Sequence, residues 1–300
     1  MNPAVVLSVA GTDSGGAAGL AADLATFAAH GTHGAAVVTA VTAQDTTGVR
    51  AVHVPPYDVV VAQVDAVLDD LPVAAVKTGM LGSPEVVRLV AERLGHLPLV
   101  VDPVLVATSG AVLGDAAVRA AYVEHLLPVA SLITPNVDEA AALLGSDSRA
   151  DGPADSPADE LAAGLAALGP AVVVTGGGTT GRCTDWLAAP GRDPIALSHP
   201  ALPTTNDHGT GCTFSAALAA HLAHVLGPAR GSSRGARGRS GAETRGLLGA
   251  DLEQAVRRAA AYTANQLMLS RHWDLGRGRG PIAHLISTNS INGRNHEETP

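Results

Sequence analysis

Residues 5–19 have the sequence VVLSVAGTDSGGAAG, in which an apolar run is followed directly by a glycine-rich loop. The run over residues 5–9 contains three valines, and β-branched side chains favour a strand. The segment 18–30 after the loop is rich in alanine and leucine, which favour a helix. A strand that passes through a short loop into a helix is the first half of a βαβ unit, so this stretch indicates a parallel sheet.

The same alternation of apolar runs and helix-like segments continues along the chain. Continuous apolar strands of this kind are typical of a parallel sheet that is covered by helices on both faces. We therefore predict an α/β fold with a central, mostly parallel sheet of about six to eight strands. The predicted strands are residues 5–9, 35–39, 73–77, 99–101, 131–134 and 171–175. The predicted helices are residues 18–30, 56–68, 84–93, 116–126, 138–144 and 157–168.

The composition argues against several classes of partner. The 300 residues include 28 acidic and 19 basic side chains, and a net charge of −9 argues against nucleic acid or an anionic membrane. Aromatic residues make up 2% of the chain, so there is no stacking platform for single-stranded nucleic acid. Two cysteines, Cys183 and Cys212, are too few for a disulfide framework, and no apolar run is long enough for a membrane span. We expect a cytoplasmic protein.

We expect one domain over residues 1–286. Within it, residues 227–249 are rich in Gly, Ser and Arg and predict a flexible insertion between two helices, because they cannot bury enough apolar surface to order themselves. The polar residues 287–300 predict a disordered tail.

Glycines and polar side chains follow the predicted strands, and ligands in such sheets bind outside the carboxyl ends of the strands. Gly11 lies in the first of these loops, where a flat small molecule could approach the main chain, and the next helix carries Asp23. Gln44 has an amide that donates and accepts together, which matches the edge of an aminopyrimidine. Met80 would be a soft apolar wall for an aromatic ring. Taken singly, Gln44 equally fits an exposed strand end and Met80 a core position.

Oxygen-bearing side chains follow the later strands. Asp102 lies at the tip of one strand, while Asn136 and Glu139 lie three residues apart and so share a helix face. This pair fits a helix N-cap with its capping-box partner, and Glu139 could at the same time order water on Mg²⁺, which prefers oxygen ligands. The loop from Thr175 to Gly177 could admit a nucleotide backbone closely.

Residues 208–213 have the sequence HGTGCT and lead into a long helix-forming segment. Gly209, Thr210 and Gly211 allow a tight turn whose N–H groups would crown a helix N-terminus, a place that suits phosphate. Cys212 at such an end would have a depressed pKa. Taken alone, this stretch is a phosphate cradle, a cysteine nucleophile or a plain helix cap.

Other catalytic patterns are absent from the sequence. It contains no Walker A motif, no G-x-S-x-G elbow and no Cys/His spacing typical of zinc. His208 and Cys212 suggest a cysteine hydrolase dyad. The two residues are four positions apart across a glycine turn, however, so there is no obvious way for their side chains to meet, and no oxyanion partner is evident.

Together and in this order, the motifs resemble those of the hydroxymethylpyrimidine/phosphomethylpyrimidine kinases of thiamine biosynthesis, within the ribokinase-like superfamily. The resemblance covers residues 5–281 approximately. It implies transfer of the γ-phosphoryl group of ATP to the hydroxymethyl group of 4-amino-5-hydroxymethyl-2-methylpyrimidine, and then conversion of the monophosphate to the diphosphate. The motifs that carry it are AGTD (residues 10–13), AD (22–23), AQDT (43–46), KTGML (77–81), VDPV (101–104), ITPN (133–136), HGTGCT (208–213) and GRGRGP (276–281).

The resemblance also implies a role for individual residues. The pyrimidine would bind against Gly11, Asp23, Gln44, Met80 and Val104. ATP would bind at Asn136, Thr175, Gly177 and Thr210, with Mg²⁺ at Asp102 and Glu139. Gly209, Thr210 and Gly211 would form the anion hole. Cys212 stands where most sugar kinases of the superfamily have an aspartate base, and its thiolate would deprotonate or orient the substrate hydroxyl. The family tendency implies a homodimer.

The chain departs from the family pattern at two places, which keeps alternatives open. Ala17, Ala21 and Ala25 stand in and after the first loop where that pattern has a glycine, a glutamine and a lysine, and Gly178 takes the place of a histidine. A pyridoxal or pyridoxine kinase would share the fold, ATP and the cysteine. A pyrimidine-binding protein without catalysis, on a decayed kinase scaffold, would share the pocket.

Overall fold

The computed structural model describes residues 2–105, 114–145, 157–177, 181–226 and 249–284. The strands are β1 (Val5–Gly11), β2 (His33–Asp45), β3 (Gly48–His53), β4 (Val73–Thr78), β5 (Leu99–Val101), β6 (Leu132–Ile133), β7 (Ala171–Val174), β8 (Arg182–Ala188) and β9 (Ile195–Pro200). The helices are α1 (Gly19–Ala29), α2 (Tyr57–Asp70), α3 (Pro84–Leu94), α4 (Ala116–Ala121), α5 (Val137–Leu143), α6 (Ala158–Ala166), α7 (Thr210–Leu226) and α9 (Gly249–Ser270). A π-helical turn (Tyr122–Leu126) and a 3-10 turn (Leu127–Val129) continue α4.

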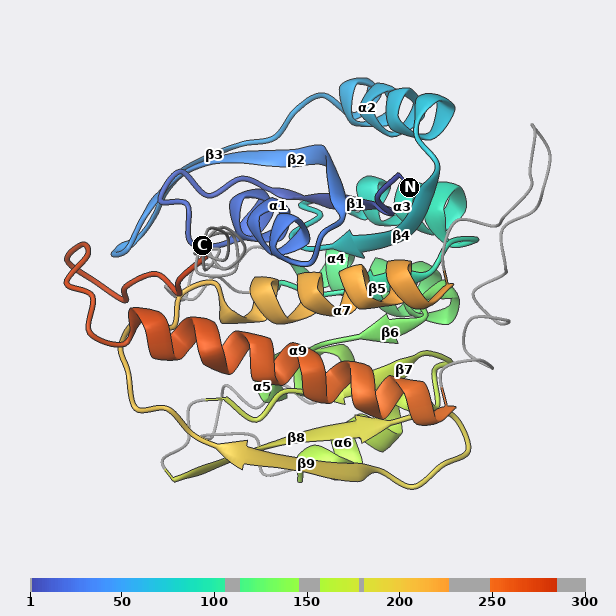
Figure 1. The fold of residues 1–300 in the computed structure, drawn as a ribbon. Helices are drawn as coiled ribbons and strands as arrows, with labels where there is room; N and C mark the ends of the chain where they lie inside the picture. The colour runs from blue at the N-terminus through green and yellow to red at the C-terminus, as the bar shows by residue number, and fades with distance from the viewer. Residues whose placement is uncertain (1, 106–113, 146–156, 178–180, 227–248, 285–300) are drawn as a thin grey trace, which may run out of the picture.

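All nine strands of the described residues form one sheet in the order β3-β2-β1-β4-β5-β6-β7-β8-β9 (Figure 1). The run from β2 to β7 in this order is parallel, which confirms the predicted α/β class. The edge strands β3 and β9, and β8 next to β9, are antiparallel to their neighbours. They raise the strand count above the predicted range, because they face solvent on one side and lack a continuous apolar run.

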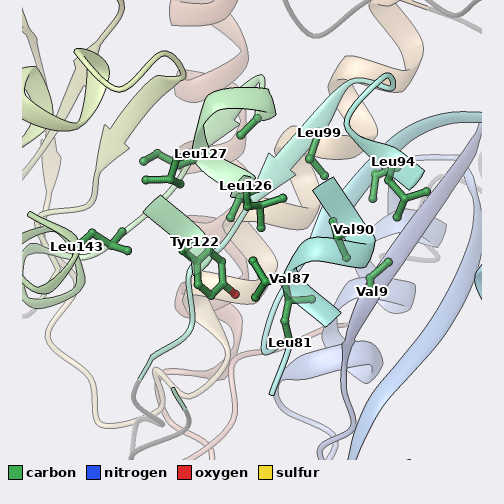
Figure 2. Packing of buried hydrophobic residues seen from close by; sticks show 14 of the residues in the cluster. Val9, Leu81, Val87, Val90, Leu94, Leu99, Tyr122, Leu126, Leu127 and Leu143 are labelled. Carbon is green, nitrogen blue, oxygen red and sulfur yellow. The ribbon is translucent and has the colours of Figure 1, made fainter. Parts of the chain in front are cut away.

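Helices cover both faces of the sheet, and each face has its own core. On one face α1, α7 and α9 pack against strand residues such as Val6 and Val100 (Figure 1). On the other face α2 to α6 cover residues such as Val9 and Leu99, with the fully buried Tyr122 among the leucines and valines of α3 and the turns after α4 (Figure 2). Alternate strand residues therefore serve opposite cores, as the pleat of a strand requires.

The ends of the parallel strands lie side by side. Val9 pairs with Thr78, Thr78 with Val101, Val101 with Ile133, and Ile133 with Val172. Residues that follow these positions are therefore gathered at one edge of the sheet. This edge is where the candidate site residues were expected.

Two parts of the predicted domain organisation lie outside the described residues. The predicted insertion falls on 227–248, with α9 beginning at Gly249, and the predicted tail falls on 287–300. The boundaries of the single domain stay a prediction. Among the described helices, none combines the length and the apolarity that a membrane crossing would need.

Candidate active site

A cavity of about 1650 Å³ opens at the carboxyl ends of the parallel strands. Its volume is larger than one small ring needs, so it has room for two ligands side by side. It brings together all but one of the predicted site residues. Those in its wall are Gly11, Gln44, Met80, Asp102, Val104, Asn136, Glu139, Thr175, Gly177, Gly209, Thr210, Gly211 and Cys212.

Asp23 is the exception, and its expected contact with substrate is wrong for this structure. Its side chain is fully buried in α1 and does not line the cavity. Lys77 of β4, also fully buried, donates to both carboxylate oxygens of Asp23 at 2.8 and 3.0 Å. Ser8 donates to the same carboxylate at 2.6 Å. Asp23 therefore acts beneath the cavity floor, as the counter-ion of a buried lysine.

Asp102 lies at the tip of β5 on the cavity side of Lys77. Its Oδ2 atom is 3.8 Å from Lys77 Nζ and accepts a hydrogen bond from Ser215 of α7 at 2.9 Å. Burial raises the pKa of Asp102, although Lys77 and Ser215 act in the opposite direction. Burial alone would lower the pKa of Lys77, but the nearby Asp23, Cys212 and Asp102 raise it above its ordinary value. Lys77 is thus an ammonium held between two carboxylates.

The Cys212 thiol lies in the first turn of α7 and accepts a hydrogen bond from the N–H of Gly19 at 3.4 Å. Gly19 is the first residue of α1, so two helix N-termini meet at this sulfur. The expectation of a depressed pKa is wrong: burial, with Asp102 and Asp23 nearby, raises the pKa of Cys212 to about 12 despite the opposing charge of Lys77. At neutral pH the group is a thiol.

The start of α7, Gly209 to Cys212, lines the cavity. Gly209 has φ +94°, and a Cβ there would overlap the main-chain oxygen of Ala17, so only glycine fits. The first intrahelical bond runs from Thr213 N to Gly209 O at 2.9 Å. The N–H groups of Gly211 and Cys212 precede that bond and have no acceptor within the helix.

Gln44 projects from β2 toward His208. Gln44 Nε2 lies 3.0 Å from His208 Nε2, and Asp13 Oδ2 lies 3.2 Å from the same ring nitrogen, which accepts from Gln44 when unprotonated and donates to Asp13 when protonated. Asp13 also accepts from the N–H groups of Gly15, Ala17 and Ala18. Burial raises the pKa of Asp13, but the bond from His208 and these main-chain bonds outweigh it, so the pKa lies below its ordinary value.

These contacts argue against the hydrolase dyad. The His208 ring lies within hydrogen-bonding distance of Gln44 and Asp13, whereas the Cys212 sulfur accepts from Gly19. His208 therefore supports a binding residue.

Asn136 and Glu139 form the predicted capping box at the start of α5. Glu139 N donates to Asn136 Oδ1 at 2.9 Å, and Asn136 N donates to Glu139 Oε2 at 3.0 Å. Burial and then the charge of Asp102 raise the pKa of Glu139 to about 8. Asn136 also forms a parallel bridge with Thr175, which joins the two predicted nucleotide loops.

Several residues of this site were not predicted from the sequence. Lys77 and Ser215 set the position of Asp102, and Asp13 sets that of His208. Lys77 had a visible signal, because it is the only lysine in the chain and interrupts an apolar strand. Of the departures from the family pattern, Ala17 is buried and Ala21 is exposed on α1, and Gly178 lies outside the described residues.

Known proteins resemble this chain in sequence. A family model described as phosphomethylpyrimidine kinase matches residues 13–233. The hydroxymethylpyrimidine/phosphomethylpyrimidine kinase of Rhizobium meliloti (strain 1021) is 40% identical over 284 residues, covering 94% of this chain and 97% of that protein.

Solved structures show the same architecture. The pyridoxal kinase from Staphylococcus aureus in complex with ADP gives a TM-score of 0.77 at 29% identity and covers 97% of this chain and 96% of its own. The phosphomethylpyrimidine kinase from Clostridium difficile 630 gives 0.65 at 31% identity and covers 87% of this chain and 98% of its own.

Proposed function

The chain belongs to the phosphomethylpyrimidine kinase family, and on that premise we propose that it phosphorylates a hydroxymethylpyrimidine with ATP. The acceptor is 4-amino-5-hydroxymethyl-2-methylpyrimidine, and its monophosphate is converted to the diphosphate in a second transfer. The observation that carries this proposal is that one cavity holds both an amide suited to an aminopyrimidine, on Gln44, and the phosphate-binding start of α7.

Gln44 supplies recognition of the pyrimidine edge. Its amide can donate to one ring position and accept from another, and His208 fixes where the amide lies. Met80 and Val104 line the same cavity and offer apolar contact to the flat ring. Gly11 lies beside Met80 in the cavity wall: a Cβ there would be 3.5 Å from the Met80 sulfur. These residues give one planar ring a wall to pack against.

The start of α7 binds the transferring phosphoryl group. The N–H groups of Gly211 and Cys212 and the positive end of the 17-residue helix attract the charge on its oxygens. Thr210, Asn136, Thr175 and Gly177 lie in the wall of the same cavity and are assigned to the nucleotide. ATP use is supported by the ADP complex of the Staphylococcus aureus relative.

The residues around Asp102 fit a magnesium ion. Burial raises the pKa of both Asp102 and Glu139, and the charge of Asp102 raises the pKa of Glu139 further, so a divalent cation would stabilise both carboxylates. Thr134, which follows β6 beside them, has a buried hydroxyl oxygen without a hydrogen-bond partner in the structure. Asp102 and Glu139 would hold the ion, and Mg²⁺ when bound neutralises charge on the transferring phosphate.

Cys212 positions the substrate hydroxyl. Its thiol stays protonated at neutral pH. Of the two roles expected for Cys212, we therefore keep the second: the thiol contacts and orients the substrate hydroxyl at the N-terminus of α7. Phosphoryl transfer passes through a loose transition state and depends chiefly on positioning and charge neutralisation, so a strong base is not required. Lys77 and Ser215 hold the Asp102 carboxylate in place near the N-terminus of α7.

The direct test is ADP release from the purified chain with ATP, Mg²⁺ and the hydroxymethylpyrimidine, repeated with its monophosphate. We expect turnover with both and a diphosphate product by mass spectrometry. Gln44→Leu should raise KM for the pyrimidine, whereas Gln254→Leu on the exposed surface of α9 should leave it unchanged. Turnover with pyridoxal but not with the pyrimidine would assign the rival function, and pyrimidine binding without ADP release would assign the non-catalytic one.

We also propose that the chain forms a homodimer and is located in the cytoplasm. The homodimer follows from the family tendency, and the cytoplasmic location from the composition. Light scattering on the purified chain, at concentrations used in the assay, tests the first, and a mass of a single chain would refute it.

A further inference from the structure

Three side chains with different donor atoms meet on the sheet edge formed by β8 and β9. One ligand atom each from Cys183, Asp185 and His199 lies within 4.8 Å of the other two. The strands explain the meeting: Cys183 and Asp185 are two apart on β8 and share a face, and Cys183 pairs directly with His199 of β9. Within the described residues, this is the cluster of such groups that could hold a metal ion.

The ring of His199 presents one nitrogen to each of two oxygen atoms. Its Nδ1 atom lies 3.3 Å from the carbonyl oxygen of Pro200, and its Nε2 atom lies 3.3 Å from Asp185 Oδ2. In the tautomer with the proton on Nδ1, the lone pair of Nε2 faces Asp185, and a metal ion between the two atoms would be bound by both.

The bond from Nδ1 to a carbonyl is also the arrangement found in metal-bound histidines, where it fixes the tautomer and the plane of the ring. The spacing fits as well. Bond lengths of about 2.0 Å to nitrogen and oxygen in a tetrahedral zinc site place these two ligands roughly 3.3 Å apart.

The peptide of Gly176 supports the other two ligands. Its N–H donates to Asp185 Oδ1 at 3.0 Å, which leaves Oδ2 for the cation. Its carbonyl accepts from the Cys183 thiol at 2.8 Å. A Cβ at position 176 would overlap the main-chain oxygen of Thr184, so glycine is needed for this approach. On binding a metal, the thiol would lose its proton and exchange this hydrogen bond for a metal–sulfur bond.

We propose that Cys183, Asp185 and His199 form a site for a thiophilic divalent transition metal such as Zn²⁺. A sulfur, an imidazole nitrogen and a carboxylate oxygen are the ligand set of zinc, whereas Mg²⁺ takes oxygen ligands alone. The site is therefore chemically distinct from the pair Asp102 and Glu139. Three protein ligands leave a fourth position open, and all three residues line the large cavity.

The position of this site gives the metal a regulatory effect, which rests on the proposed kinase function. Gly176 connects the site directly to Thr175 and Gly177, the residues assigned to the nucleotide. An ion bound here would take up space on the nucleotide side and shift the Gly176 peptide as the thiol bond is lost. Zn²⁺ should therefore raise KM for ATP, with Mg²⁺ in excess.

Cobalt titration of the purified chain under reducing, anaerobic conditions tests the site without reference to kinase activity. We expect a thiolate-to-cobalt charge-transfer band and the intense visible bands of tetrahedral Co²⁺. Both should disappear when Zn²⁺ is added, because Zn²⁺ displaces the cobalt. Cys183→Ser should abolish the charge-transfer band, and His199→Gln should weaken cobalt binding. Thr184→Ala, whose hydroxyl bonds Ser198 on the opposite face of the same strands, should leave both unchanged.

The second cysteine supplies the deciding control. The band should persist in Cys212→Ser; its loss there and persistence in Cys183→Ser would overturn the proposal. Absence of the band in the parent chain would also overturn it, and the contact between His199 and Asp185 would then be an ordinary hydrogen bond. If cobalt binds as expected but Zn²⁺ leaves KM for ATP unchanged, the metal site stands and its link to the nucleotide is refuted.

Discussion

The N–H of Gly19 donates to the sulfur of Cys212 at 3.4 Å, which joins the first residue of α1 to the first turn of α7. These two residues are separated by 193 positions in the sequence. The contact brings the glycine-rich loop after β1 to the turn that begins α7. It also leaves the half-buried thiol near the carboxylates of Asp23 and Asp102, so that the helix ends do not make it acidic.

Cys212 should resist alkylation in the folded chain at neutral pH. Because its pKa is about 12, the fraction of thiolate near pH 8 is small. We expect the rate of iodoacetamide labelling at Cys212, followed by peptide mass spectrometry, to rise without a plateau up to pH 10. In urea the same thiol should titrate near its ordinary value of about 8.5. A midpoint near pH 7 in the folded chain would contradict the buried-thiol assignment.

Magnesium activation should depend on the proton of Glu139. The carboxyl has a pKa of about 8, and a metal ligand must be deprotonated. The concentration of Mg²⁺ needed for half-maximal turnover should therefore fall as pH rises from 6 to 8, by up to about tenfold per unit. In Glu139→Gln, which keeps the capping-box geometry, the requirement should be higher and independent of pH over this range. If the Mg²⁺ requirement of this variant still changed with pH as it does in the parent, Glu139 would not be a magnesium ligand.

The stability of the metal-free chain should fall over the same range. Between the ordinary pKa of 4.5 and the raised value of about 8, the folded chain holds a proton on Glu139 that the unfolded chain has released. The contribution of this group is thus complete below pH 4.5 and is lost as pH rises through 8. Urea unfolding without Mg²⁺ should show this decline in the parent and a flatter profile in Glu139→Gln. Parallel profiles would show that Glu139 is not the titrating group.

Replacing Lys77 should destabilise the fold strongly. Lys77→Met removes the partner of two buried carboxylates, and breaking a buried ion pair typically costs about 3–5 kcal/mol in the free energy of unfolding. The double variant with Asp23→Asn should recover part of this loss. Arg88→Met breaks an exposed pair with Glu85 and should cost less than about 1 kcal/mol. A similarly small effect of Lys77→Met would refute the role given to the pair.

Two glycines of the phosphate-binding turn should respond differently to alanine. Gly209→Ala places a Cβ against the Ala17 oxygen at φ +94° and should cost about 2–4 kcal/mol of stability. At Gly211 a Cβ would lie 4.0 Å from Asp102 Oδ2, so Gly211→Ala should change stability by less than about 1 kcal/mol. Its methyl group would enter the cavity, and kcat should fall. Full activity of Gly211→Ala would argue against phosphate binding at this turn.

Much of the architecture could be predicted, because buried parallel strands are continuous apolar runs. All the predicted strands were found, and so was the capping box of Asn136 and Glu139, which depends on residues three apart. The strands β3, β8 and β9 were missed. In β9 a single residue, Leu197, is buried, so the segment carries no apolar run.

The residues that line the cavity could be predicted, because ligands in parallel sheets bind outside the carboxyl ends of the strands. The direction of their pKa shifts could not be predicted in the same way. A helix N-terminus lowers the pKa of a cysteine, and that local effect was all the sequence offered at Cys212. The opposing effects of burial and of Asp23 and Asp102 come from distant parts of the chain. Asp23 was expected at the substrate from the family resemblance, whereas its partner Lys77, 54 residues away, holds it in the interior.

Lys77 is the only lysine in the 300 residues, and its side chain is fully buried. A lysine-specific protease can therefore cut this chain after one residue alone, and only while β4 is detached from its neighbours. Amine-reactive labels likewise have a single ε-amino target. Both reagents report the opening of the central sheet directly, so the molecule carries its own probe for native-state unfolding and for how far bound ligands suppress it.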